Sequence, residues 1–140
     1  MNTEKNIKTL IVKKPLKLDC GKTIKDFPIA YETYGSLNSK KDNAILVFHA
    51  LTGDQFVTGI NPVTNKEGWW SYAVGPDKAI DTNKFYVICV NSLGSCFGST
   101  GPASINQITG EPFRLTFPEL TIDDMATATK LLLDLSLIHI

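Results

Sequence analysis

The chain has 140 residues, of which 43% are hydrophobic and 20% are charged, with 14 basic and 14 acidic side chains. This length fits one domain or part of one, and the composition is that of an ordinary soluble globular protein. Because the formal net charge is zero, no electrostatic field gathers nucleic acid or anionic lipid, and neither partner is expected.

The N-terminal residues 1–15 are predicted to be flexible and residues 16–140 to form the domain. The first 14 residues lack the long apolar core of a signal peptide, and no apolar run reaches membrane-spanning length. Three cysteines are too few for a disulfide scaffold, so reduced thiols and a cytoplasmic location are expected. Residues 16–20 and 27–35 predict an antiparallel pair at a sheet edge, joined through the turn at Gly21-Lys22.

Two continuous apolar runs, 44–48 and 85–91, predict strands that are buried on both faces of a parallel sheet. The first run is followed by a polar loop, His49-Ala50-Leu51-Thr52-Gly53. In open α/β sheets, ligands bind at the carboxyl ends of the strands. Residues 49–53 are therefore predicted to border an active site.

The rest of the chain predicts one long connection and one helix. Residues 92–118 are rich in Gly, Ser, Thr, Asn and Pro without a period, and are expected to cover the same site as residues 49–56. Thr121, followed three residues later by Asp124, predicts the start of a helix over 121–135. The alternation of elements indicates an α/β fold with parallel strands and right-handed crossovers. Residues 135–140 supply no further buried strand, so the sheet is expected to be unfinished.

Several ordered motifs together resemble the homoserine O-acetyltransferases, a family of acyltransferases in methionine biosynthesis. The resemblance runs from about Leu16 to Leu135 and implies an α/β-hydrolase fold. Only the N-terminal half of the sheet is expected, truncated before the nucleophile elbow. The motifs are His49-Ala50-Leu51-Thr52-Gly53-Asp54, Gly68-Trp69-Trp70 with Gly75-Pro76, and Asn91-Ser92-Leu93-Gly94-Ser95-Cys96-Phe97-Gly98-Ser99-Thr100-Gly101-Pro102.

The resemblance implies transfer of an acetyl group from acetyl-CoA to L-homoserine by a ping-pong route through a serine nucleophile, a histidine and an aspartate. Acetyl-CoA would be a co-substrate, and no bound cofactor is expected. The backbone N–H of Leu51 would be one oxyanion donor. Thr52, Gly53, Asp54 and Gln55 would lie near the acyl group or the acceptor, and the full-length enzyme is expected to be a homodimer.

The nucleophile is absent, because no Gly-x-Ser-x-Gly pattern occurs in the 140 residues. Gly94-Ser95-Cys96-Phe97-Gly98 has the formal spacing of a cysteine elbow, but Ser-Thr-Gly-Pro cannot start the helix that an elbow requires. His49 is interpreted as holding the loop through a ring hydrogen bond, because a catalytic base so early violates the α/β-hydrolase order. Asp54 can equally bond its own loop backbone. No spacing of Cys and His matches a metal site.

The chain alone is therefore predicted to be inactive. It is also predicted to be poorly soluble, because the outer edge of strand 44–48 would be unpaired. The alternatives are a fragment of a serine or homoserine O-succinyltransferase of the same fold, a fragment of a general serine hydrolase, or a non-catalytic binding module.

Overall fold

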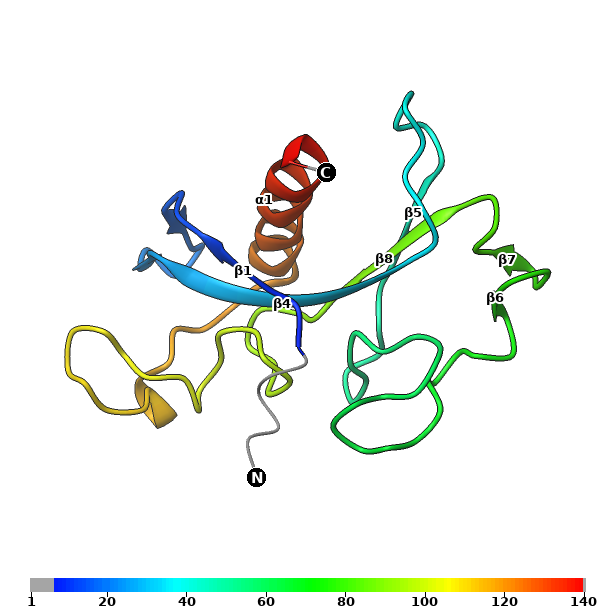
Figure 1. The fold of residues 1–140 in the computed structure, drawn as a ribbon. Coiled ribbons are helices and arrows are strands. Elements are labelled where there is room, and N and C mark those ends of the chain that lie inside the picture. Colours follow the sequence, from blue (N-terminus) through cyan, green and yellow to red (C-terminus); the bar gives the residue numbers. More distant parts are fainter. Residues whose placement is uncertain (1–6, 140) are drawn as a thin grey trace. The chain divides into compact units, whose positions relative to one another are not determined.

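The chain divides into two compact units, and strand β4 (Phe27–Tyr34), labelled in Figure 1, has residues 27–30 in unit 2 and residues 31–34 in unit 1. The computed structural model describes residues 7–139, with side chains as far as residue 136. Unit 1 comprises residues 7–8 and 31–90, and unit 2 comprises residues 9–30 and 91–139. Residues 1–6, part of the predicted flexible N-terminus, lie outside the described residues.

Unit 1 contains the predicted parallel pair of strands. β5 (Ala44–Val47) pairs in parallel with β8 (Tyr86–Val90), and Val47 lies opposite Cys89. The second half of β4 pairs with the other side of β8 in the antiparallel direction. All five residues of β8 are buried, as expected of a continuous apolar run between two neighbouring strands.

The burial predicted for strand 44–48 is wrong. Val47 is buried, but Ala44 is exposed, Ile45 and Leu46 are only half-buried, and the side chain of Phe48, just past the end of β5, is 63% exposed. In the described part of the chain β5 has β8 as its only strand partner. One edge of the strand is therefore open, and an apolar run alone does not bury a strand that has a single neighbour.

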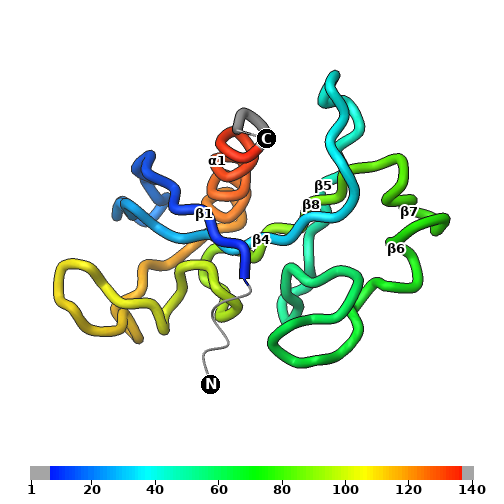
Figure 2. The backbone as a smooth tube through the Cα atoms, in the orientation of Figure 1, coloured from blue at the N-terminus to red at the C-terminus, as the bar shows by residue number. Residues whose placement is uncertain are grey.

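The core of unit 1 brings residues of β5 and β8 together with residues from the long connection between them, whose course Figure 2 traces. That connection ends in two short parallel strands, β6 (Val74–Gly75) and β7 (Ile80–Asp81). The buried core residues are Val47, Val57, Val74, Val87 and Cys89, with Tyr34, Ile45, Trp70 and Ile80 packed against them.

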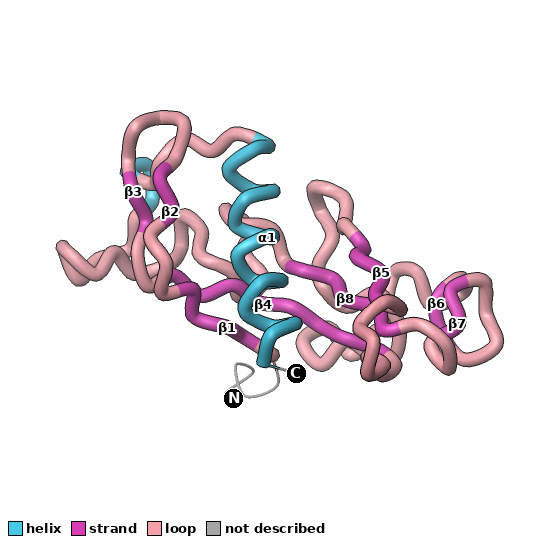
Figure 3. Tube along the Cα trace, turned by 90° about the horizontal axis from the view of Figure 1, so that it is seen from above, coloured by secondary structure: helices cyan, strands magenta, loops and turns pink. Residues whose placement is uncertain are grey.

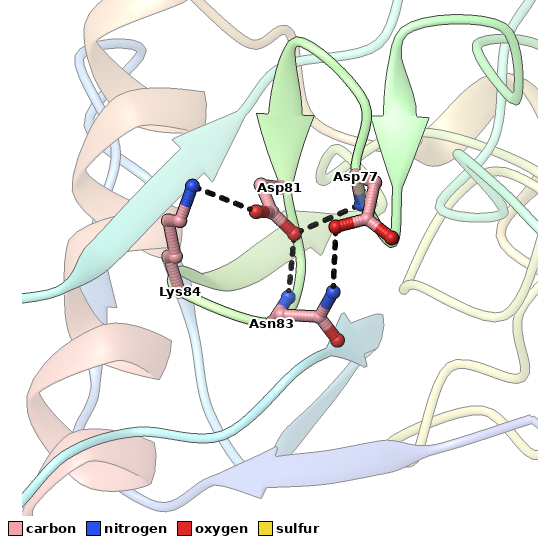
Figure 4. A network of polar contacts seen from close by, with 4 residues as sticks. All are labelled: Asp77, Asp81, Asn83 and Lys84. Carbon is pink, nitrogen blue, oxygen red and sulfur yellow. Dashed lines mark hydrogen bonds and ion pairs between the residues drawn. The ribbon is translucent and has the colours of Figure 1, made fainter.

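The turn after β7 is organised by one buried carboxylate, that of Asp81 (Figure 4). It accepts hydrogen bonds from the backbone N–H groups of Asp77 (3.1 Å) and Asn83 (3.0 Å). The Nζ atom of Lys84 lies 3.1 Å from the same carboxylate. The N–H donors of Asn83 and Asp77 hold the pKa of Asp81 below its ordinary value of 3.8, although desolvation opposes them.

Unit 2 contains a strand that the sequence analysis missed, and its pairing corrects the predicted hairpin. β1 (Thr9–Val12) is the antiparallel partner of the first half of β4, whereas the predicted partner was residues 16–20. β2 (Leu16–Lys17) instead pairs with β3 (Thr23–Ile24). A tight turn between β2 and β3 explains this pairing. Hydrogen bonds between Leu18 and both Gly21 (φ +85°) and Lys22 close the turn, so that β2 meets β3 in a separate small hairpin before the chain reaches β4.

Helix α1 (Ile122–His139) confirms the predicted start. The Thr121 hydroxyl accepts a hydrogen bond from the Asp124 N–H (3.2 Å), and the Asp124 carboxylate accepts one from the Thr121 N–H (2.9 Å). The same two side chains also bind Asp19. The Asp124 carboxylate accepts from the Asp19 N–H (3.1 Å), and the Thr121 hydroxyl donates to the Asp19 carboxylate (2.6 Å), which connects the helix to the β2–β3 hairpin.

The helix continues past the predicted end at residue 135, because neither Gly nor Pro follows to stop it. None of the described helices combines the length and the apolar character needed to cross a membrane. Residues 92–118 are irregular as predicted, apart from the short 3₁₀ turn η2 (Arg114–Thr116), and Figure 3 draws this segment as loop with one short helical piece.

Replacing Asp124 by Ala is expected to lower the free energy of unfolding by about 1–2 kcal/mol, because it leaves two backbone donors unsatisfied at a buried position. Asp123 is the matched control: it lies in the same first turn, is exposed, and its side chain makes no hydrogen bond among the described residues. Asp123→Ala should cost only a few tenths of a kcal/mol. Urea unfolding followed by circular dichroism measures both; equal costs would contradict the capping role.

Asp81 should make the stability of the chain depend on pH. Because its pKa is lowered in the folded state, its stabilising contribution is present above the unfolded value of 3.8 and is lost as the pH falls through the lowered pKa. Asp81→Asn is expected to be less stable at neutral pH and to lose less stability between about pH 5 and pH 3 than the unmodified chain. Urea unfolding at a series of pH values measures the free energy of unfolding of both proteins. If this free energy fell equally with pH in the variant and in the unmodified chain, the prediction would be refuted.

Candidate active-site loop

The loop after β5 leaves the carboxyl end of the parallel strand pair in unit 1, as the sequence predicts. Its centre is a tight turn in which the Gly53 N–H donates to the Ala50 carbonyl (2.8 Å). A Cβ added to Gly53 would lie 3.0 Å from the His49 Cβ and 3.2 Å from the Ala50 carbonyl oxygen. Another residue at position 53 would therefore require these neighbours to shift by a few tenths of an ångström.

His49 supports this turn through its ring. Its Nδ1 atom lies 2.7 Å from the Ala50 carbonyl oxygen. Because a carbonyl can only accept, Nδ1 carries the proton of this bond. The ring hydrogen bond predicted for His49 is confirmed, and the Ala50 oxygen accepts from both the imidazole and the Gly53 N–H.

Leu51 occupies the second position of the turn and is fully exposed, with a relative accessibility of 100%. Among the described residues nothing accepts a hydrogen bond from its backbone N–H. The His49 and Gly53 bonds both end on the Ala50 carbonyl oxygen, which belongs to the same peptide group as the Leu51 N–H, and so they fix this amide directly. Leu51 thus presents an immobilised donor to whatever lies beyond the loop, which is the property that an oxyanion site needs.

The remaining predicted site residues differ in how accessible they are. Thr52 is exposed and Gly53 half-buried, whereas Gln55 is completely buried. Asp54 uses both carboxylate oxygens inside the loop: one accepts from the Phe56 N–H (2.8 Å) and the other from the Asn61 side-chain amide (2.8 Å). Asp54 thus bonds within its own loop, which was one of its two predicted roles. Contact of the four residues with a substrate stays a prediction.

The sequence analysis missed two residues that anchor this loop. Trp69 donates from its indole Nε1 to the Asp54 carbonyl (3.0 Å). Asn61 holds Asp54 with its amide nitrogen, and its oxygen accepts from the N–H groups of Val63 (2.8 Å) and Thr64 (3.2 Å). The Asn61-Pro62 dipeptide is a turn signal, but nothing in the sequence pairs it with Asp54.

The cysteines do not supply a nucleophile of the elbow type. Cys96 is exposed in an irregular segment, and no helix begins there, as predicted. Cys89 is buried in the core of unit 1, and burial, followed by the charge of Asp54, raises its pKa to about 12. A thiol with this pKa stays protonated at neutral pH and is a poor nucleophile. No group of side chains within residues 7–136 has the make-up of a metal site.

The loop after β8 lies in unit 2 and is bound to β4. The Ser99 hydroxyl accepts from the Ala30 N–H (3.0 Å) and donates to the Asn91 carbonyl (2.6 Å), and all three residues are buried. Ser99 is therefore a structural link between this loop and the sheet strand. That residues 92–118 cover the site of residues 49–56 stays a prediction.

Comparison with curated proteins identifies close relatives, although no model of a known protein family matches the chain. The homoserine O-acetyltransferase of Pelagibacter ubique is 65% identical over 128 residues, which are 91% of this chain and 34% of the relative. That of Mesorhizobium japonicum is 58% identical over 121 residues, 86% of this chain and 31% of the relative. The chain thus spans about a third of the length of the curated relatives it matches.

Solved structures of two kinds of enzyme resemble this one. A homoserine O-acetyltransferase from Bacillus anthracis superimposes with a TM-score of 0.83 at 34% identity, over 92% of this chain and 36% of that protein. Esterase E22 superimposes with a TM-score of 0.81 at 35% identity, over 92% of this chain and 37% of the esterase chain. The described fold is therefore shared by an acyltransferase and a hydrolase.

The three thiols should differ in reactivity. Iodoacetamide is expected to modify Cys20 and Cys96, which are exposed, in the folded chain, and to modify Cys89 only after unfolding in urea. Mass spectrometry of the digested protein, with and without urea, measures the three rates separately. Labelling of Cys89 as fast as Cys96 under native conditions would show that its burial and raised pKa have been misassigned.

Proposed function

We propose that this chain, which belongs to the homoserine O-acetyltransferase family as its N-terminal part and has the α/β-hydrolase fold, serves the transfer of an acetyl group from acetyl-CoA to L-homoserine. The products would be O-acetyl-L-homoserine and CoA. The observation that carries the proposal is the exposed amide of Leu51, held in a tight turn at the carboxyl end of β5. The identity of 65% to a relative of that name supports it.

The role of Leu51 follows from the charge that develops during acyl transfer. When a nucleophile attacks the acetyl carbonyl, the carbon becomes tetrahedral and its oxygen gains negative charge. A fixed N–H directed at that oxygen stabilises the intermediate and needs no reorganisation. Leu51 would supply one donor. The sequence contains no Gly-x-Ser-x-Gly, so the serine nucleophile and the second donor are assigned to residues outside these 140, and the chain alone is expected not to turn over.

The residues after Leu51 would shape the space next to that oxygen. Thr52 offers an exposed hydroxyl, and Gly53 brings the backbone close. Asp54 and Gln55 would act from less accessible positions, chiefly by fixing the loop. Acetyl-CoA serves as a co-substrate in this proposal, the reaction takes place in the cytoplasm, and the full-length enzyme is a homodimer.

A second candidate function is ester hydrolysis, favoured by the similarity to esterase E22. Hydrolysis uses the same oxyanion donor and differs in the acceptor, which is water in place of the homoserine hydroxyl. Release of CoA that requires L-homoserine distinguishes transfer from hydrolysis.

A chimaera tests the proposal with a matched pair of variants. The matching 128 residues of the Pelagibacter ubique enzyme are replaced by those of this chain, and CoA release from acetyl-CoA is measured with L-homoserine. Leu51→Pro removes the N–H, and proline is well tolerated at the second position of such a turn. Leu51→Ala keeps the N–H and is the control. The proline variant should lose roughly 10²–10³-fold in kcat, and the alanine variant little.

Three results would contradict the proposal. One is a chimaera that folds but releases no CoA; another is equal activity of the two Leu51 variants. The third is hydrolysis of acetyl esters without any dependence on L-homoserine, which would favour the esterase function instead.

A further inference from the structure

Unit 2 contains a cavity of about 740 Å³ between residues 22–28, which run from β3 into β4, and the loop over residues 100–118. This volume lies within the range of small-molecule sites in proteins. Apolar side chains from both segments line it, among them Ile24 and Phe27 from residues 22–28 and Ile105 and Phe113 from the loop. None of the residues of the active-site loop belongs to it.

Backbone hydrogen bonds fix both walls of this cavity. The Thr100 N–H and hydroxyl both donate to the Pro28 carbonyl (2.9 and 3.0 Å), which attaches the start of the loop to β4. The loop is then closed on itself by the bond from the Phe113 N–H to the Ser104 carbonyl (3.0 Å) and by a bridge between Ile105 and Pro112. The cavity is therefore part of the folded loop and needs no ligand to form it.

The charges around the cavity favour an anion. Lys22 and Lys25 line it, and neither ammonium has a hydrogen bond or ion pair among the described residues. Asp26 is the only acidic side chain in the lining, and its carboxylate lies 3.1 Å from the Nζ atom of Lys13, outside the lining. Two lysines whose ammonium groups have no partner in the part of the chain that the structure describes thus line an apolar cavity.

We propose that this cavity binds an amphipathic anion, with an apolar chain against Ile24, Phe27 and Phe113 and an oxyanion head at Lys22 and Lys25. The head can be a carboxylate or a phosphate, because a lysine ammonium acts as a point charge toward either. Burial of the apolar chain supplies the affinity, and the lysines select the charged end. This site is independent of the acyl transfer proposed above and is tested by binding alone.

Equilibrium dialysis of octanoate and octyl phosphate against the 140-residue chain measures the binding. Octanol and acetate are the controls that lack the charge and the apolar chain. Reversing both charges in Lys22→Glu/Lys25→Glu should weaken the binding of both probes by about tenfold or more. Lys17→Glu changes an exposed lysine of the neighbouring β2 that does not line the cavity, and it should leave the affinity unchanged.

A variant in the apolar wall tests the other half of the ligand. Ile105 is half-exposed, so Ile105→Asp should fold, as circular dichroism would verify, yet abolish binding. Binding of either probe with these effects supports the site and identifies its preferred head. The proposal is overturned if neither probe binds, if octanol binds as tightly as octanoate, or if the double lysine variant binds like the Lys17→Glu control.

Discussion

The parallel pairing of β5 with β8 is the constraint on which the candidate active site depends. It aligns Val47 with Cys89, so that the chain leaves β5 at the carboxyl end of a parallel pair. β8 is buried throughout and provides the rigid partner, and the core residues Val57 and Val74 hold the connection between the two strands. A shift of one residue in this register would reverse the faces of β5 and would displace the turn that presents Leu51.

The turn itself is held by ordinary loop interactions. The Ala50 carbonyl accepts hydrogen bonds from the His49 ring and the Gly53 N–H. The Asp54 carboxylate accepts hydrogen bonds from the Phe56 N–H and the Asn61 side-chain amide, which lie further along the chain. None of these bonds involves chemistry on a substrate. Their combined effect is to fix the amide of the exposed residue Leu51 in place, and in the proposed function this backbone group acts while the side chains of the loop only position it.

The features predicted from the sequence are those encoded over short distances. The apolar run of β8, the Thr121–Asp124 cap and the ring bond of His49 each depend on neighbours in the chain, and each is confirmed. The errors concern long-range contacts. The pairing of β1 with β4, the partial exposure of β5 and the bond from Trp69 to Asp54 are decided by which segments meet in the fold, and local patterns carry no information on that choice.

Under the proposed function, the exposure of Leu51 also gives a physical reason to expect that this loop alone does not catalyse acyl transfer. In water a hydrogen bond to the amide replaces one to solvent, so its net value is small, whereas in a water-excluded site the same donor is worth about 3 kcal/mol toward a developing charge. Leu51, a residue with a relative accessibility of 100%, is in the first situation. Under the proposed function, this amide would therefore gain catalytic value only once further polypeptide and substrate cover the carboxyl end of β5, next to the open strand edge and the exposed Phe48.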